Sequence, residues 1–154
     1  MAKRFENKVV WITEGGSGIG RSLALAFAEE GATVAVSGRR QERLELVATE
    51  IEGKGGKALA VPCDVTDEAS VESAVQRVVE TFGRLDVAVA NAGFSVAGKI
   101  EKLSAKDWRR QLDVNVVGLA MTARHSIPYL KENGGRLVLV GSVSGMIATP
   151  GVGA

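Results

Sequence analysis

The chain alternates short, continuous apolar runs with longer segments of helical periodicity, and this alternation constrains its fold more than any other feature. Continuous runs of Val, Ala, Leu and Ile are typical of strands buried on both faces of a parallel sheet. Segments with apolar residues three and four apart are typical of the helices that connect such strands. The runs are 9–12, 33–36, 58–61, 87–89 and 137–140, and the helical segments are 18–30, 41–53, 67–82 and 105–131. The alternation predicts an α/β fold.

Composition is ordinary for one globular domain over residues 1–154, with 45% apolar and 24% charged residues. The net charge of +1 gives no general attraction for nucleic acid or for an anionic membrane. No long apolar stretch or cleavage-like segment follows Met1. Cys63 is the only cysteine, which excludes an intrachain disulfide and a cysteine-based metal cluster. We expect a cytoplasmic protein without a bound metal, a nucleic-acid partner or a membrane association.

A glycine-rich turn, TEGGSGIG over residues 13–20, separates the first apolar run from the first helical segment. In such a turn, backbone N–H groups and a helix N-terminus can approach a pyrophosphate that a Cβ would push away. Gly18 and Gly20 are the natural contact positions. Turns of this kind also allow a strand and a helix to pack closely, so the glycines alone leave both interpretations open.

The turn resembles the T-G-x-x-x-G-I-G turn of the short-chain dehydrogenase/reductase family, and four later segments resemble further family motifs in the same order. They are similar to its D-V segment, N-N-A-G, D-V-N-x-x-G and S-S-x-A-G, and lie at residues 64–65, 90–93, 113–118 and 141–145. The resemblance covers the whole chain. It implies a Rossmann-type doubly wound parallel sheet of five strands in the order 3-2-1-4-5, with helices on both faces.

The resemblance also implies a function: an NAD(P)-dependent oxidoreductase that acts on the carbonyl/alcohol pair of a small-molecule substrate and associates as a homo-oligomer. The cofactor-binding residues that it implies are Thr13, Gly15, Ser17, Gly18, Ile19, Gly20, Arg39, Asp64, Val65, Asn91, Ala92 and Gly93. We expect Asn91 to act first as a structural residue that holds the central strands together. A helix-capping role is the alternative for Asp64.

The end of the second strand bears on the choice of dinucleotide, because an acid there binds a ribose 2′-OH and a base binds a 2′-phosphate. Gly38 stands at the family's acid position and Arg39 follows it, which favours NADP over NAD. The alternative is that Arg39 and Arg40 are solvated residues at the start of a charged helix. Glu14 replaces the family's first glycine, and its charge opposes phosphate binding unless the carboxylate turns outward.

Ser142 and Asn115 match the family's catalytic serine and asparagine. The resemblance implies that Ser142 hydrogen-bonds the substrate carbonyl or hydroxyl and that Asn115 anchors a water in a proton relay. Without the resemblance, an Asn inside a helix more often forms an interhelical hydrogen bond.

In family members, the position that follows the one matched by Ala154 holds the Tyr of a Tyr-x-x-x-Lys motif. This Tyr supplies the proton for the reaction. Tyr129, the only tyrosine, stands before the fifth strand and does not match it. We therefore expect a truncated chain that is inactive alone, with the fifth strand as an exposed edge. The alternative is a non-catalytic nucleotide-binding or interaction module.

Overall fold

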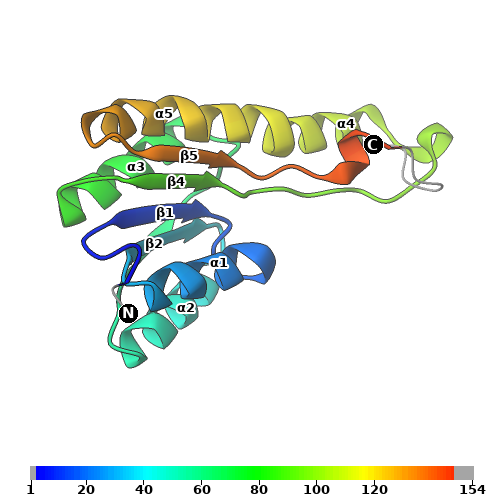
Figure 1. Cartoon of the computed structure of the whole chain (residues 1–154). Coiled ribbons are helices and arrows are strands. Elements are labelled where there is room, and N and C mark those ends of the chain that lie inside the picture. Colours follow the sequence, from blue (N-terminus) through cyan, green and yellow to red (C-terminus); the bar gives the residue numbers. More distant parts are fainter. Residues whose placement is uncertain (1–2, 148–154) are drawn as a thin grey trace.

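The computed structural model describes residues 3–147 and contains a five-stranded parallel sheet in the order β3-β2-β1-β4-β5 (Figure 1). Every neighbouring pair of strands is parallel. The strands are β1 (Val9–Thr13), β2 (Thr33–Gly38), β3 (Lys57–Pro62), β4 (Val87–Ala90) and β5 (Arg136–Leu139). The predicted Rossmann-type topology is confirmed.

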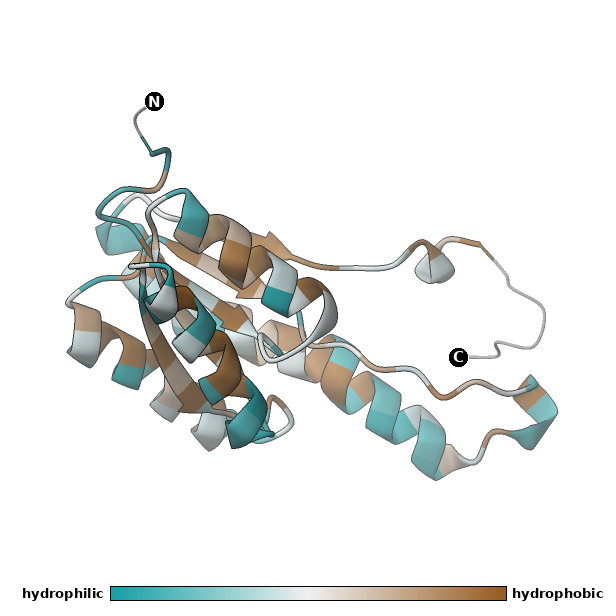
Figure 2. Cartoon of the chain, turned by 90° about the horizontal axis from the view of Figure 1, so that it is seen from below, coloured by the Kyte–Doolittle hydropathy of each residue, from teal (hydrophilic) through white to brown (hydrophobic). Residues whose placement is uncertain are grey.

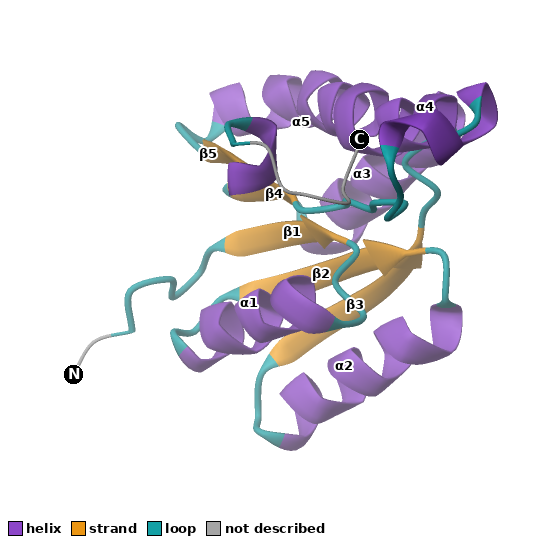
Figure 3. Ribbon diagram, turned by 90° about the vertical axis from the view of Figure 1, so that its right-hand side faces the viewer, coloured by secondary structure: helices purple, strands orange, loops and turns teal. Residues whose placement is uncertain are grey.

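Helices cover both faces of the sheet (Figures 1 and 3). On one face, α1 (Gly18–Glu29) and α2 (Gln41–Gly53) pack on β1, β2 and β3. On the other face lie α3 (Glu68–Phe82) and α5 (Leu119–Glu132), which also contact each other. Each helix pair closes its own hydrophobic cluster against the sheet. The strands form the hydrophobic middle layer, shown in brown in Figure 2.

The sheet is most deeply buried at its centre and most exposed at β5. All five residues of β1 are buried, and Trp11 at its middle donates an indole N–H hydrogen bond to Ser37 Oγ on β2 over 2.7 Å. In β5, by contrast, Val138 is 43% exposed and Leu139 is 52% exposed. The expectation that the fifth strand forms an exposed edge is therefore confirmed.

The helical segment expected over residues 105–131 consists of three consecutive helices. They are α4 (Ala105–Leu112), a π-helix η2 (Asp113–Gly118) and α5. Gly118 lies against the third-strand loop so closely that a Cβ there would be 2.8 Å from Val65 Cγ2. The π-helix covers few residues, so apolar periodicity alone does not distinguish it from an α-helix.

Two short 3-10 helices and several caps complete the fold. The 3-10 helices are η1 (Ile100–Lys102) and η3 (Val143–Gly145). Ser104 and Asp107 form the predicted capping box at the start of α4. Asp67 caps α3 by accepting a hydrogen bond from the Ala69 N–H.

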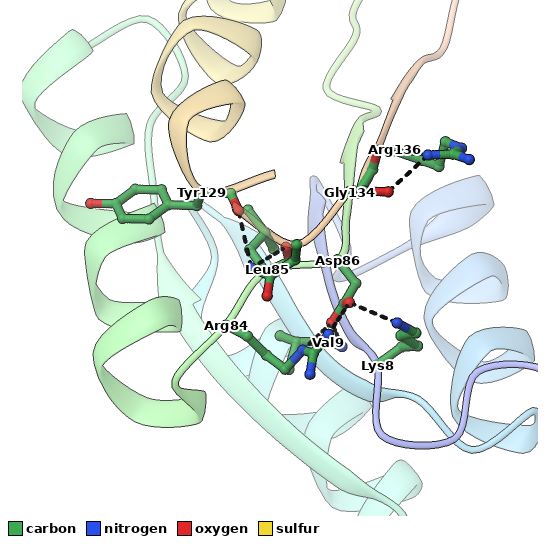
Figure 4. Close-up of polar contacts among 10 residues, drawn as sticks. Lys8, Val9, Arg84, Leu85, Asp86, Tyr129, Gly134 and Arg136 are labelled. Atoms are coloured by element: carbon green, nitrogen blue, oxygen red, sulfur yellow. Dashed lines mark hydrogen bonds and ion pairs between the residues drawn. The ribbon is translucent and has the colours of Figure 1, made fainter. Parts of the chain in front are cut away.

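A buried carboxylate fastens the sheet at the edge where its strands begin (Figure 4). Asp86, with 4% of its side chain exposed, accepts hydrogen bonds from the Val9 N–H at 2.9 Å, from Lys8 Nζ at 3.1 Å and from two nitrogens of Arg84 at 2.8 and 2.7 Å. Burial raises the pKa of this carboxyl, but the hydrogen bonds from Arg84, Val9 and Lys8 outweigh burial and leave the pKa below its ordinary value.

Candidate functional site

The opposite edge, where the strands end, carries the glycine turn. The chain winds from β1 to β2 and β3 in one direction and then returns to β4, so the strand order reverses between β1 and β4. In open parallel sheets, ligands bind outside the carboxyl ends of the strands at such a reversal. Figure 3 views the sheet from this edge, with the turn between β1 and α1 facing the reader.

The glycines of the turn serve different purposes. Gly15 donates its N–H to Ser37 O over 2.9 Å, and a Cβ there would lie 2.7 Å from Val36, so Gly15 packs the turn on β2. A Cβ at Gly20 would be 2.3 Å from Glu14 O, so Gly20 lets α1 approach the turn. Gly18 has a φ of +52° and no atom within 4 Å of a Cβ position, so it faces open space.

The N-terminus of α1 is open beside Gly18. Ser17 stands at the N-cap, but its side chain makes no capping hydrogen bond and instead accepts one from Arg40 Nη2 at 3.3 Å. The first turn of α1 contains no acidic residue. Unsatisfied backbone N–H groups and the positive end of the helix dipole form an anion-binding site. Ile19, 64% exposed, lies in the same turn.

Thr13 and Asn91 join the ends of β1 and β4. Thr13 Oγ1 accepts hydrogen bonds from the N–H groups of Asn91 at 3.0 Å and Ala92 at 3.1 Å, and Asn91 Nδ2 donates to Thr13 O at 3.0 Å. Asn91 therefore holds the central strands together, as predicted. Thr13 is 1% exposed and Ala92 7% exposed, so both support the turn from behind.

Glu14 points along the turn toward β2. A Cβ at Gly38 would lie 3.6 Å from Cδ and from each carboxylate oxygen of Glu14. The carboxylate therefore lies beside the end of β2. Sequence reasoning placed Glu14 near the phosphates and did not reveal its approach to Gly38, because the two residues stand 24 positions apart in the chain.

A hollow of about 390 Å³ opens at the same edge of the sheet. It brings together Glu14 and four residues predicted from the sequence, Arg39, Asp64, Val65 and Gly93. The remaining lining residues are Thr66, Phe94, Lys106, Arg109, Arg110, Asp113 and Val114.

The basic residues of α4 were not among the predicted site residues. Lys106, Arg109 and Arg110 stand three and four positions apart, a spacing that places them on one face of a helix and could have revealed them. The Arg110 guanidinium lies 4.5 Å from the centre of the Phe94 ring.

The residues after β3 are held by local hydrogen bonds. Asp64 Oδ1 accepts from Thr66 N at 3.0 Å and Thr66 Oγ1 at 2.7 Å, so it orders the loop, while Asp67 caps the helix. Burial raises the pKa of Asp64, but the Thr66 hydrogen bonds and the charge of Arg39 together leave the pKa below its ordinary value. Val65 is 6% exposed and packs against Gly118. Burial raises the pKa of the Cys63 thiol to about 11.

Asn115 fastens the loop after β4. Its Oδ1 accepts a hydrogen bond from the Phe94 N–H at 2.9 Å, and its Nδ2 donates to Phe94 O at 2.8 Å. Asn115 lies in the π-helix, where the altered turn directs its side chain at this loop. Asn115 therefore bonds to a loop backbone. The alternative interpretation, an interhelical hydrogen bond, predicted a partner on another helix.

Ser142 follows β5 and is exposed. It caps η3, since its Oγ accepts a hydrogen bond from the Ser144 N–H at 3.1 Å. Within residues 3–147, no hydrogen bond joins the side chains of Ser142 and Asn115, and the two predicted catalytic residues stand on separate elements.

Tyr129 lies away from this edge. Figure 4 shows Tyr129 beside Leu85, at the end of the sheet where the strands begin. His125 Nε2 lies 3.0 Å from Glu68 Oε1 of α3, an acidic partner that the local sequence does not show. Among the described residues, no cluster of three or more His, Cys, Asp or Glu could hold a metal ion. None of the helices over 3–147 is long and apolar enough to cross a bilayer.

The doubly wound parallel sheet, with its glycine turn at the strand-order reversal, defines a Rossmann-type α/β protein. The family model described as short chain dehydrogenase matches residues 8–154. The chain belongs to the short-chain dehydrogenase family.

Individual relatives agree with this membership. A 3beta-hydroxysteroid dehydrogenase of Mediterraneibacter gnavus is 38% identical over 98% of this chain and 55% of its own length. A 3-oxoacyl-[acyl-carrier-protein] reductase of Thermotoga maritima is 37% identical over 96% of this chain and 61% of its own length. The chain thus spans little more than half the length of these relatives.

Solved structures show the same fold. The crystal structure of NAD+-bound xylitol dehydrogenase matches with a TM-score of 0.93 and 33% identity, over 97% of this chain and 58% of the other. A 3-ketoacyl-ACP reductase from Sinorhizobium meliloti 1021 matches with a TM-score of 0.86 and 45% identity, over 89% of this chain and 55% of the other.

Proposed function

We propose that residues 1–154 form the dinucleotide-binding domain of an NAD(P)-dependent oxidoreductase that acts on the carbonyl/alcohol pair of a small molecule. The observation that carries the proposal is the open N-terminus of α1 beside Gly18, at the strand-order reversal. The dehydrogenase and reductase names of the relatives support the same activity.

The residues present fit a dinucleotide. A Cβ at Gly18 would project into the open space that a pyrophosphate would use, and the Ser17 side chain leaves the first-turn N–H groups free of a cap. The hollow lined by Asp64 and Arg39 lies next to this turn and would take the adenosine half. The Glu14 carboxylate lies beside Gly38 at the end of β2, so it does not fill the phosphate position.

When bound, the nicotinamide ring of the dinucleotide would exchange a hydride with the substrate carbon. Ser142 would donate its hydroxyl proton in a hydrogen bond to the substrate oxygen. The Ser144 N–H already donates to Ser142 Oγ, which leaves the Ser142 proton available for that bond. Asn115 would act as a positioning residue, because both of its polar side-chain atoms hold the Phe94 backbone beside the hollow.

We propose that these 154 residues bind the dinucleotide without turning over substrate. A carbonyl that accepts a hydride also needs a proton. The single tyrosine of the chain, Tyr129, lies where the strands begin, whereas Ser142 follows the end of β5. The non-catalytic module is the less favoured function, since the relatives carry enzyme names.

Two broader expectations belong with this proposal. Exposed apolar side chains on η2 and at the end of α4, including Leu112 and Val116, support association into a homo-oligomer. A cytoplasmic location and the NADP preference based on Arg39 remain predictions. Arg39 is exposed and lines the hollow, so a 2′-phosphate could reach it.

The test is calorimetric titration of the purified chain with NADH and with NADPH. Saturable binding of at least one of them, abolished when the nucleotide site is preloaded with the other or with ADP-ribose, supports the proposal. An absence of heat with both nucleotides, from a chain whose circular dichroism shows the folded α/β protein, refutes it.

A further inference from the structure

The Glu14 carboxylate occupies the space beside the end of β2. A Cβ at Gly38 would lie 3.6 Å from each carboxylate oxygen, which is van der Waals contact. In dinucleotide-binding folds, an acid at this point accepts hydrogen bonds from the adenosine ribose hydroxyls. Gly38 itself brings no side chain, which leaves room for Glu14 from the neighbouring turn.

The backbone of the turn directs Glu14 toward β2. Glu14 has a φ of +50°, a conformation that non-glycine residues adopt infrequently. It is flanked by two hydrogen bonds: Gly15 N–H donates to Ser37 O at 2.9 Å, and Asn91 Nδ2 donates to Thr13 O at 3.0 Å. The side chain is therefore aimed by a turn that is tied to both β2 and β4.

The Glu14 carboxylate is available as an acceptor. Within residues 3–147, no Lys, Arg or His nitrogen forms an ion pair with it. Arg39, which lines the same hollow, is not paired with it and lies close enough to Asp64 to favour the charged form of that carboxyl. The other charged groups around the hollow are Asp113 and the α4 bases Lys106, Arg109 and Arg110.

We propose that Glu14 selects NAD over NADP, by accepting hydrogen bonds from the adenosine ribose hydroxyls and by repelling a 2′-phosphate. This inference rests on the proposed dinucleotide-binding function. It reverses the NADP preference predicted from Arg39. Arg39 is exposed to solvent, whereas Glu14 is half-buried with its carboxylate beside Gly38, so repulsion by Glu14 is screened less.

The experiment compares dissociation constants for NADH and NADPH, by protein-to-nicotinamide fluorescence transfer, in the wild-type chain and in Glu14→Gln. The Gln side chain keeps the size and the backbone requirement of Glu14 and removes its charge. We expect the wild-type chain to bind NADH at least about tenfold more tightly than NADPH, and Glu14→Gln to move this ratio toward NADPH by about tenfold or more.

Glu52→Gln is the matched control, because Glu52 is exposed on α2 and does not line the hollow. It should leave the ratio unchanged, which excludes an effect of net charge alone. Arg39→Ala should weaken NADPH binding more in the Glu14→Gln background than in the wild type, because only without the Glu14 charge would a 2′-phosphate bind near Arg39.

Two failures are distinguishable. Binding with the same NADH/NADPH ratio in the wild type and in Glu14→Gln, or a wild-type preference for NADPH, overturns the role of Glu14 and leaves the proposed function standing. Binding of neither nucleotide by either folded variant overturns the proposed function, and the role of Glu14 with it.

Discussion

Thr13 Oγ1 accepts a hydrogen bond from the Asn91 backbone N–H over 3.0 Å, and this bond joins the end of β1 to the end of β4 at the point where the strand order reverses. The Ala92 N–H donates to the same oxygen at 3.1 Å. A single hydroxyl therefore satisfies two backbone donors where two central strands diverge. The position of the glycine turn relative to the β4 loop depends on it.

Thr13→Val should destabilise the chain by about 2–4 kcal/mol, because it leaves two backbone N–H groups, one of them fully buried, without an acceptor. Urea unfolding measures this loss. Thr49→Val is the matched control: the same change at an exposed position on α2 should alter stability by less than about 0.5 kcal/mol. Equal losses in the two variants would show that Thr13 does not join the strands in this way.

Gly18→Ala should weaken dinucleotide binding by at least about tenfold while the fold persists. The new Cβ meets no protein atom within 4 Å but projects toward the proposed phosphate position. The left-handed backbone at Gly18 should cost about 1 kcal/mol of stability. Titration with the preferred nucleotide and urea unfolding separate the two effects.

Gly53→Ala provides the comparison for Gly18→Ala. A Cβ at Gly53 also meets open space, but at the end of α2 away from the glycine turn. Binding should remain at the wild-type level in this variant. Unchanged nucleotide affinity in Gly18→Ala would mean that the phosphates do not approach the turn at that glycine.

The layout of the sheet was predictable from the sequence because each parallel strand is a continuous apolar run. The buried pattern of β1 and the helical periodicity of α2 are local properties of the chain, so their alternation predicted the α/β fold. The strand order came from the resemblance to the family. The Ser104–Asp107 capping box was predictable for the same reason. The π-helix was not, since it is too short for apolar periodicity to distinguish it from an α-helix.

The site was only partly predictable, because its chemistry depends on contacts between residues far apart in the chain. The motif positions place Gly18 and Asn91 at the correct edge of the sheet. The direction of the Glu14 side chain depends on the φ of one residue and on the empty position at Gly38. Likewise, the motif at Asn115 does not reveal that its partner is the Phe94 backbone.

Asp86→Asn should reduce stability at pH 7 by about 1–3 kcal/mol, since a neutral amide is a weaker acceptor for Arg84, Lys8 and the Val9 N–H. The pKa of Asp86 is lowered in the folded state, so its contribution is fully present above the unfolded value of about 3.9. It is lost as the pH falls through the lowered folded pKa. The difference between the wild type and Asp86→Asn should therefore hold from pH 7 to pH 5 and shrink below pH 4.

Urea unfolding of both proteins at several pH values measures this difference. Asp113→Asn, at an exposed position, is the control for the same chemical change and should alter stability at pH 7 by less than about 0.5 kcal/mol. A wild-type advantage over Asp86→Asn that grows on acidification would contradict the lowered pKa.

Asn115→Ala should release one of two separate fastenings of the loop after β4. Asn115 Oδ1 holds the Phe94 N–H at 2.9 Å, while Gln111 Oε1 holds the Val96 N–H at 3.0 Å. Amide hydrogen exchange measures the protection of the Phe94 and Val96 N–H groups separately. We expect exchange at Phe94 to accelerate by about tenfold or more in Asn115→Ala, with a smaller change at Val96. Gln111→Ala should show the converse.

Asn115→Asp keeps the acceptor for the Phe94 N–H and loses only the donor to Phe94 O, so it should protect Phe94 better than Asn115→Ala does. Equal acceleration at Phe94 and Val96 in both alanine variants would mean that the loop opens as one unit and that Asn115 does not position Phe94 by itself.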